Sequence, residues 1–346
     1  MTPERRHSLS DFDYTLPPEL IAQRPAAQRG ESRLLAVHRD SGALEDLWFG
    51  ALVSLVPAGD LLVLNSTRVR HARFIGTRPS GAPAEVLLIH PAPDGAWVAL
   101  GRPGTALRPG KRVRIGPDAF IETAEILEDG NRLIRFVGTT ADDAMERYGR
   151  LPLPPYITRE PDENDEDRYQ TVFADREGSV AAPTAGLHFT GQLLGALRAK
   201  GVRLGTLDLE VGPGTFKPVE TEDLSRHVMH PERFEISTDL AEAVQATRTG
   251  GGKVWAVGTT AVRALEAAAI DKGRIRPGRD ETRLFIRPGY RFKVVDRLIT
   301  NFHLPRTTLL MLVSAFAGRD PIRNAYQHAI DQRYRFYSYG DAMVIL

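Results

Sequence analysis

The sequence predicts an α/β main domain with a mostly parallel sheet, plus an inserted small all-β domain that is barrel-like. After residue 190, strand-type and helix-type segments alternate, a pattern typical of a sheet with helical crossovers. Between about residues 70 and 140, short β-type runs follow one another with turn residues between them and no helical period. We therefore expect a discontinuous α/β catalytic domain, 1–68 and 150–346, interrupted by an all-β domain at 69–149.

The elements of the main domain follow from periodicity and from the residues that begin or end each segment. Gly201 and the pair Gly250–Gly251 end helical runs. Pro305 lies near the first turn of another helical run. We expect strands at 61–65, 202–212, 253–258, 282–289 and 292–300, and helices at 190–201, 238–251, 260–273 and 305–318.

The inserted segment has strand-type runs at 84–91, 96–102, 111–116, 120–127 and 132–138. The tetrapeptide EDGN at 128–131 is a hairpin signal between the last two of these runs. A helical pattern returns only at 141–149. Short strands with frequent turns favour a small barrel or sandwich.

Composition excludes several classes of protein. The chain has 346 residues, of which 42% are hydrophobic and 26% charged, and it contains no cysteine. Disulfides, thiolate catalysis and cysteine-based metal sites are therefore excluded. The first residues contain no apolar signal-like segment, and the longest apolar run, 309–318, is too short to span a bilayer. We expect a cytoplasmic protein that does not bind a membrane.

The distribution of charge is more informative than the net charge of +1. Residues 66–118 contain nine Arg or Lys against three acids, and residues 160–167 contain six acids. A basic segment in a neutral chain can be the electrostatic footprint of a polyanion such as RNA. The alternative is a solvated β surface whose charges are paired.

Two motifs bear on phosphate and metal binding. The segment VGPGTF at 211–216 contains Gly212 and Gly214, but no Lys-Ser/Thr follows, so nucleoside triphosphate chemistry is not expected. The glycines permit a tight turn or close approach to a ligand. His227 and His230 could in principle ligate a metal, but Pro231 interrupts the segment and no third histidine is near. Substrate contacts or loop hydrogen bonds are the favoured alternative, and no metal site is expected.

Polar residues stand at the ends of several predicted strands, at positions where a hydrophobic core does not require them. Ligands of open α/β sheets bind at the carboxyl ends of strands, and helix N-termini favour anions. Helix capping is the alternative for the threonines. The residues at these strand ends are Asn65, Thr67, Arg68, Thr259, Thr260, Asn301 and His303, and the segment AAPTAGLHFT adds Thr184, Gly186 and His188.

A dozen segments, in order along nearly the whole chain, resemble the S-adenosylmethionine:tRNA ribosyltransferase-isomerase family of queuosine biosynthesis. They include LLVLNSTRV, GRLPLPPYI, GSVAAPTAGLHFT, VGPGTFKPV, HVMHPERFEI, VGTTAVRALE, LITNFHLPRTTLLMLVSAFAG and YRFYSYGDAM. The resemblance implies that S-adenosylmethionine is a consumed ribosyl donor and that no cofactor or metal is needed. It also implies a partner, tRNA with a GUN anticodon carrying preQ1 at the wobble position. The implied products are epoxyqueuosine in the tRNA, adenine and methionine.

The resemblance also selects site residues. The chemistry needs a base at C5′ of the donor and an acid that assists adenine departure, and the sequence does not say which residue serves as either. The candidates for catalysis are His188, His303, His227 and Asp341. The candidates for substrate binding are Thr184, Gly186, Asn65, Thr67, Arg68, Gly212, Gly214, Thr259, Thr260, Arg263, Asn301, Arg335 and Tyr339. Either domain could contact the tRNA, and a monomer is expected.

Two other functions are considered. A methyltransferase that uses S-adenosylmethionine would have a glycine-rich loop after an early strand, but residues 61–70 contain no glycine. A non-catalytic RNA-binding protein would use the strand-end polar residues only as caps. Release of adenine from S-adenosylmethionine in the presence of tRNA distinguishes both alternatives from ribosyl transfer.

Overall fold

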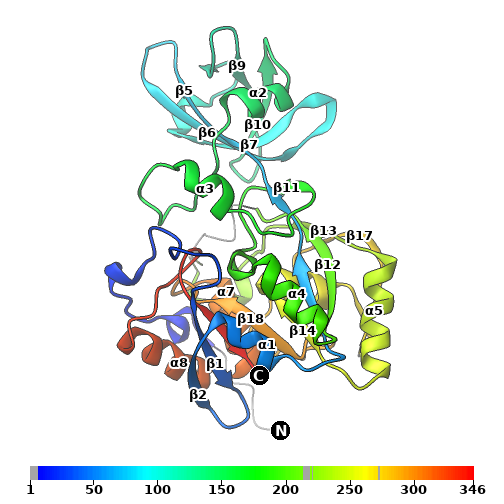
Figure 1. Ribbon diagram of the computed structural model, residues 1–346. Coiled ribbons are helices and arrows are strands. Elements are labelled where there is room, and N and C mark those ends of the chain that lie inside the picture. The colour runs from blue at the N-terminus through cyan, green and yellow to red at the C-terminus, as the bar shows by residue number, and fades with distance from the viewer. Residues whose placement is uncertain (1–6, 213–218, 220, 272) are drawn as a thin grey trace.

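A nine-stranded mixed sheet forms the centre of the main part of the molecule (Figure 1). The structure is a computed structural model, and it describes residues 7–212, 219, 221–271 and 273–346. The strand order is β17 (Gly278–Thr282), β13 (Glu232–Ile236), β12 (Arg203–Leu209), β3 (Leu61–Asn65), β14 (Val254–Val257), β18 (Arg297–Asn301), β19 (Ala342–Ile345), β1 (Arg33–His38) and β2 (Ala43–Trp48).

The mixed α/β fold is confirmed, but the sheet is not mostly parallel. Its parallel pairs are β12–β3, β3–β14, β14–β18 and β19–β1. Its antiparallel pairs are β17–β13, β13–β12, β18–β19 and β1–β2. The centre of the sheet is therefore parallel, and both flanks contain antiparallel pairs.

The connections explain the mixture. A short turn at 39–42 joins β1 to β2, which makes a hairpin, and Gly42 there has φ +72°. The helices α7 (Thr308–Ala317) and α8 (Arg319–Asp331) follow β18 and contact each other. Two successive helices return the chain to the end of the sheet that it left, so β19 runs antiparallel to β18. The alternating segments recognisable in the sequence are the parallel strands with single helical crossovers.

Side chains alternate between the two faces of the central strands, and each face has its own core. In β3, Leu61 and Val63 face one cluster, whereas Leu62 and Leu64 face the other. The first cluster is covered by α5 (Thr238–Thr249), α6 (Thr259–Ala267), α7 and α8. The second is covered by α1 (Leu52–Leu55) and α4 (Gly191–Ala199). Burial on both faces explains why these strands are continuous apolar runs.

A second sheet of six antiparallel strands closes into a barrel at one end of the molecule (Figure 1). Its order is β10 (Arg132–Val137), β7 (Trp97–Arg102), β6 (Pro83–Pro91), β5 (Arg73–Thr77), β8 (Arg112–Arg114) and β9 (Phe120–Ile126), and its own apolar core includes Phe74, Val86 and Ile121. The strands predicted between 84 and 138 are confirmed. The hairpin at 128–131 is also confirmed, since Leu127 N–H donates to the Asn131 carbonyl at 2.9 Å.

The remaining short elements lie between these two parts or at the edge of the main part. They are α2 (Ala141–Tyr148), α3 (Glu163–Arg168), the 3-10 helix η6 (Thr184–His188), and the small strand pairs β4 (Arg68–Val69) with β11 (Glu177–Ser179) and β15 (Ala269–Asp271) with β16 (Arg274–Ile275). In the part of the chain that the structure describes, no helix is both long and apolar enough to cross a membrane.

Three predicted elements are wrong in their bounds. The strand expected at 292–300 is β18, which begins only at Arg297. The strand expected at 282–289 is β17, which ends at Thr282, and residues 283–287 have no regular structure. The helix expected at 260–273 ends at Ala267, and β15 follows it. In the latter two regions the apolar residues pack against the main core from irregular or short segments, so burial there does not require the periodicity of a long element.

Candidate functional site at the ends of β14 and β18

A pocket lies at the carboxyl ends of the neighbouring strands β14 and β18. Its walls combine the start of α6, the residues after β18, the 3-10 helix η6 and the C-terminal segment. The lining residues that bear on function are Tyr156, Thr184, Gly258, Thr259, Thr260, Thr300, Asn301, His303, Thr307, Tyr337 and Ser338. The predicted meeting of strand ends is therefore found for Thr184, Thr259, Thr260, Asn301 and His303.

The start of α6 presents unsatisfied donors to this pocket. Gly258 joins β14 to α6 at φ +89°, a conformation that glycine adopts without strain. No side chain caps the helix, and the hydroxyl of the buried Thr260 has no hydrogen-bond partner among the described residues. Uncapped N–H groups and the helix dipole favour an anion here. The capping alternative for these two threonines does not hold in this structure.

His303 is the one predicted titratable residue that lines the pocket. Its Nε2 lies 2.8 Å from Thr300 Oγ1, and its backbone N–H donates to Tyr326 Oη at 2.8 Å. Burial lowers the pKa of His303 to about 3. The imidazole is therefore neutral at physiological pH, and a neutral ring nitrogen can accept a proton.

His188 lies behind the pocket wall and is not one of the residues that line it. Its Nδ1 is 2.8 Å from Ser32 Oγ, and Asn301 Nδ2 donates to its Nε2 at 3.1 Å. Burial, assisted by the positive charge of Arg335, lowers the pKa of His188 to about 3. Both ring nitrogens are engaged by protein groups, so the predicted catalytic role finds no support in its position.

Asn301 connects His188 to the pocket. Besides His188, its Nδ2 donates to the Tyr337 carbonyl at 3.1 Å. Its Oδ1 is buried and has no hydrogen-bond partner among the described residues. An unpaired buried acceptor typically costs about 1–3 kcal/mol, so a ligand donor at this oxygen would be stabilising.

Two tyrosines form an aromatic wall of the pocket. The rings of Tyr156 and Tyr337 are 4.7 Å apart, and Tyr156 Oη lies 2.5 Å from Ser338 Oγ. Tyr337 has φ +72°, which is unusual for a bulky side chain. Strain of this kind persists where surrounding structure enforces it, and it is common at ligand sites.

Three predicted binding residues, Asn65, Thr67 and Arg68, instead hold the end of β3 in place. Asn65 exchanges two hydrogen bonds with the backbone of Leu209 on β12, at 3.0 and 3.1 Å. Thr67 Oγ1 lies 2.8 Å from Ser179 Oγ, and Arg68 donates to the Ala174 carbonyl at 2.8 Å. None of the three lines the pocket.

The C-terminal candidates also make structural contacts. Asp341, predicted to be catalytic, accepts from the backbone N–H groups of Arg33 at 2.9 Å and Arg335 at 2.8 Å. These bonds join the start of β1 to the tail, and they satisfy both carboxylate oxygens. Neither Asp341 nor Arg335 lines the pocket.

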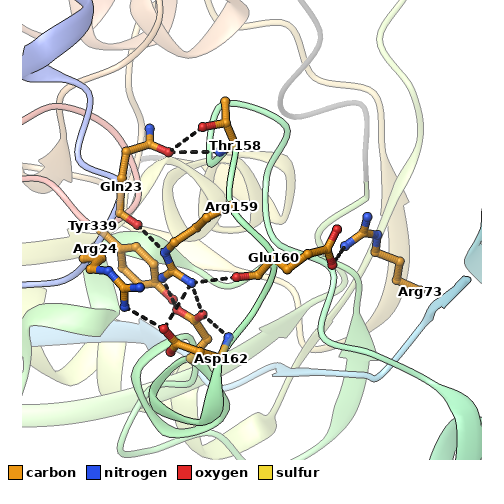
Figure 2. A network of polar contacts seen from close by, with 9 residues as sticks. Gln23, Arg24, Arg73, Thr158, Arg159, Glu160, Asp162 and Tyr339 are labelled. Carbon is orange, nitrogen blue, oxygen red and sulfur yellow. Dashed lines mark hydrogen bonds and ion pairs between the residues drawn. The ribbon is translucent and has the colours of Figure 1, made fainter.

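Tyr339 belongs to a polar network around α3 (Figure 2). Its hydroxyl donates to the fully buried Asp165 at 2.6 Å, and Arg159 binds the same carboxylate with two donors, at 2.6 and 2.7 Å. Burial raises the pKa of the Asp165 carboxyl, but the hydrogen bonds from its partners, Arg159 above all, outweigh this effect and lower the pKa. The network continues through Glu160 to Arg73 on β5, and so it joins the acidic segment to the barrel.

The remaining candidates lie elsewhere. Arg263 forms a buried ion pair with Glu232, and His227 packs its ring against Phe285. Gly186 is required for packing, since a Cβ there would lie 2.8 Å from Phe173. Gly212 has open space around its Cα, and Gly214 is outside the described residues. Within the described residues, no three His, Asp or Glu side chains gather as a metal site needs.

Sequence reasoning missed several residues of this site. Ser32 stands just before β1, and nothing in its sequence context marks it. Tyr156 occurs in the segment GRLPLPPYI, and Ser338 and Tyr337 occur in YRFYSYGDAM. Both segments contribute to the family resemblance, so a polar or aromatic residue within a matched segment is the signal that could have found them.

A pocket that combines apolar walls with several buried polar side chains, at the ends of parallel strands beside an uncapped helix, is typical of α/β proteins that bind a small charged metabolite. The chain belongs to the queuosine biosynthesis protein family, whose model matches residues 9–345. It is 53% identical over 340 residues to the S-adenosylmethionine:tRNA ribosyltransferase-isomerase of Ralstonia pickettii, an alignment that covers 98% of this chain and 94% of the relative.

Two further comparisons agree with this assignment. The chain is 51% identical to the protein of the same name from Symbiobacterium thermophilum, with 98% of this chain and 99% of the relative covered. It also resembles the crystal structure of an S-adenosylmethionine tRNA ribosyltransferase from Thermotoga maritima. That similarity has a TM-score of 0.57 and 37% sequence identity, and it covers 97% of this chain and 100% of the other.

Proposed function

We propose that this protein is an S-adenosylmethionine:tRNA ribosyltransferase-isomerase. It transfers and isomerises the ribosyl part of S-adenosylmethionine onto preQ1 at the wobble position of tRNA. The products are epoxyqueuosine-tRNA, adenine and methionine. The observation that carries the proposal is full-length identity of about one half to relatives of that name, in a chain whose strand ends form a pocket for a charged metabolite.

The donor binds in this pocket with its methionyl carboxylate at the start of α6. The uncapped N–H groups there supply the donors, and the Thr260 hydroxyl supplies another. The aromatic wall of Tyr156 and Tyr337 contacts an apolar or planar part of the donor. Arg263, the other group considered for the carboxylate, is already paired with Glu232.

His303 is proposed as the proton acceptor. The sulfonium of the donor acidifies the C5′ hydrogens, and removal of one starts the loss of adenine. Burial keeps the His303 imidazole neutral but also weakens it as a base, so the proposed role rests on its position in the pocket wall. A positioned histidine typically contributes about 10²–10⁴-fold to such a step. The amine of preQ1 then forms a C–N bond to the ribosyl fragment and releases a proton. Methionine leaves as the bond between its sulfur and C5′ breaks and an oxygen of the ribosyl fragment bonds to C5′, which forms the epoxide.

The barrel is proposed as a separate inserted domain, 69–149, that contacts the tRNA backbone. Arg108 and Lys111 stand in one exposed turn before β8, where the Lys111 N–H donates to the Arg108 carbonyl at 3.0 Å. Neither side chain has an ion-pair partner among the described residues. Free basic groups suit phosphate contacts, and the preQ1 base of an anticodon loop can be turned outward toward the pocket.

The proposal includes no metal and no separate cofactor, because S-adenosylmethionine is itself consumed. It also includes a monomer and a cytoplasmic location. GUN-anticodon tRNAs are the proposed partners.

Product analysis under single-turnover conditions, with tRNA carrying preQ1, tests the proposal. We expect adenine and methionine to appear together, in equal amounts. S-adenosylhomocysteine would instead show methyl transfer, and tRNA binding without any product would show a non-catalytic RNA-binding protein.

A further inference from the structure

Three residues from distant parts of the chain form a hydrogen-bonded row that ends in the pocket. Ser32 precedes β1, His188 ends η6, and Asn301 ends β18. Ser32 Oγ lies 2.8 Å from His188 Nδ1, and Asn301 Nδ2 lies 3.1 Å from His188 Nε2. Ser32 is 6% exposed, His188 5% and Asn301 2%, so solvent does not compete for these bonds.

The donors and acceptors in this row have only one consistent arrangement. The Asn301 Nδ2 faces the Tyr337 carbonyl at 3.1 Å as well as His188 Nε2. A flipped amide would place an oxygen against that carbonyl, which can only accept. The Asp341 carbonyl, 3.5 Å from the same nitrogen, favours the same orientation. The amide nitrogen therefore faces acceptors only, His188 Nε2 carries no proton, and the histidine proton is on Nδ1, where it is donated to Ser32 Oγ.

This arrangement leaves Asn301 Oδ1 as the amide atom available to a ligand. The residue lines the pocket, and its Oδ1 is buried with no partner among the described residues. An amide oxygen accepts hydrogen bonds and carries partial negative charge. It therefore suits a cationic donor group better than it suits a carboxylate.

The position of Asn301 relative to α6 identifies that group. Gly258, just before α6, donates its N–H to the Ile299 carbonyl at 2.8 Å, so the ends of β14 and β18 lie side by side. Adjacent strands are about 4.8 Å apart. An α-amino acid carries its ammonium and its carboxylate on one carbon, and the two could occupy these neighbouring strand ends together.

We propose that Asn301 accepts a hydrogen bond from the methionyl ammonium group of the donor, and that Ser32 and His188 are positioning residues that hold its amide in the accepting orientation. This inference rests on the proposed function, because that function supplies the donor. It assigns His188 a role through Asn301 and not in proton transfer.

The test compares substitutions that keep or remove the acceptor at position 188. In His188→Gln, the amide oxygen can accept from Asn301 while the amide nitrogen donates to Ser32. In His188→Leu, the acceptor is absent. We expect His188→Leu to weaken binding of S-adenosylmethionine about tenfold, the size of one hydrogen bond, and His188→Gln to remain within about threefold of the wild type. His38→Gln, at a histidine whose side chain is 41% exposed and lies outside the pocket, is the matched control.

Calorimetric binding of three ligands identifies the contacted group. Asn301→Leu should weaken S-adenosylmethionine and its decarboxylated form equally, by about tenfold, because both retain the amine. It should leave binding of 5′-methylthioadenosine, which lacks the amino-acid group, unchanged. If the decarboxylated ligand escaped this penalty, Asn301 would contact the carboxylate and the inference would be wrong.

Affinity, activity and thermal stability together separate a positioning role of His188 from a catalytic role and from a folding defect. If His188 acts through Asn301, the double variant His188→Leu/Asn301→Leu loses no more affinity than Asn301→Leu alone. Additive losses of affinity would show that His188 does not act through Asn301. If His188 were a proton acceptor, His188→Gln would be as inactive as His188→Leu while binding the donor normally. Thermal denaturation of each variant identifies one that fails to fold. Donor binding is measured without turnover. Absence of adenine release would therefore contradict the proposed function, while the binding test of Asn301 and His188 would still be valid.

Discussion

The strand-end pocket and the barrel place their polar groups in opposite ways. In the pocket, Asn301, Thr260 and His303 are buried, and two of them have polar atoms without partners among the described residues. In the barrel, the core is apolar except for the buried Thr123, whose hydroxyl also lacks a partner among the described residues, and basic residues such as Arg108 and Lys111 are exposed. Buried polar atoms are costly, whereas exposed charges are well solvated.

This difference separates two tasks. The cost of incomplete hydrogen bonding in the pocket is recovered when a ligand fills it, so the pocket suits a specific small molecule. The exposed basic residues of the barrel act at longer range and are weakened by salt, so they suit a polyanion. Substitutions in the two regions should therefore affect different ligands.

The largest effect is expected at His303. We expect His303→Gln to slow adenine release about 10²–10⁴-fold, the usual contribution of a proton-transfer residue, and to change tRNA binding little. Rapid-quench measurement of adenine with preQ1-tRNA gives the rate. His38→Gln, a substitution outside the pocket, should react at the wild-type rate. A His303→Gln protein that releases adenine normally would exclude His303 as the proton acceptor.

The next effect concerns the network between the two regions. Asp165→Asn removes a fully buried charge from Arg159 and Tyr339, and losing one partner of such a pair costs about 3–5 kcal/mol. We expect the free energy of unfolding to fall by about 3 kcal/mol in urea denaturation. Asp167→Asn on the same helix alters an 86% exposed side chain and should cost less than about 1 kcal/mol. Equal losses in both variants would show that burial of Asp165 is not what matters.

A smaller effect is expected on the barrel. Replacing Arg108 and Lys111 together by serine should weaken tRNA binding and make the logarithmic salt dependence shallower by about 0.7–0.9 for each phosphate that is no longer neutralised. Binding of S-adenosylmethionine should not change. The control is Arg323→Ser on α8, at an exposed site outside the barrel. If the control reduced the salt dependence and the barrel variant did not, the tRNA would contact the main domain.

The last prediction concerns the pH dependence of stability. The folded-state pKa values of His188 and His303 are lowered to about 3, against about 6.5 in the unfolded chain. Below pH 6.5 the unfolded state takes up protons that the folded state does not. Stability is therefore fully present above pH 6.5 and falls as pH drops toward 3, by up to about 1.4 kcal/mol per pH unit for each histidine. His188→Gln should reduce this slope by one proton in denaturation at pH 4–6. An unchanged slope would contradict the burial effect at His188.

The comparison also explains what the sequence could predict. Parallel strands and barrel strands are regular and have clear patterns, as in LLVLN at 61–65 and RLIRFVG at 132–138. The sequence identified the polar residues at strand ends, but it did not show which of them line a pocket and which only hold the fold together. Asn65 and Asn301 occupy equivalent positions at the ends of buried strands. The side chain of Asn65 is paired with Leu209, whereas Asn301 Oδ1 has no partner in the part of the chain that the structure describes.

Long-range partners account for the rest. The contacts that decide the role of His188 come from Ser32 and Asn301, 156 and 113 residues away. Asp165 belongs to an acidic run that is typical of a solvated surface, but Arg159 and Tyr339 bury it. Such pairings depend on the assembled fold, and a single sequence does not reveal them.

A crystal structure of the protein with S-adenosylmethionine bound tests the central claim most directly. We predict the methionyl carboxylate at the start of α6, beside Thr260, with the ammonium at Asn301 Oδ1 and C5′ near His303. Donor density in another cavity, such as the acidic one lined by Asp208 and Glu210, would contradict the assignment of the strand-end pocket as the reaction site.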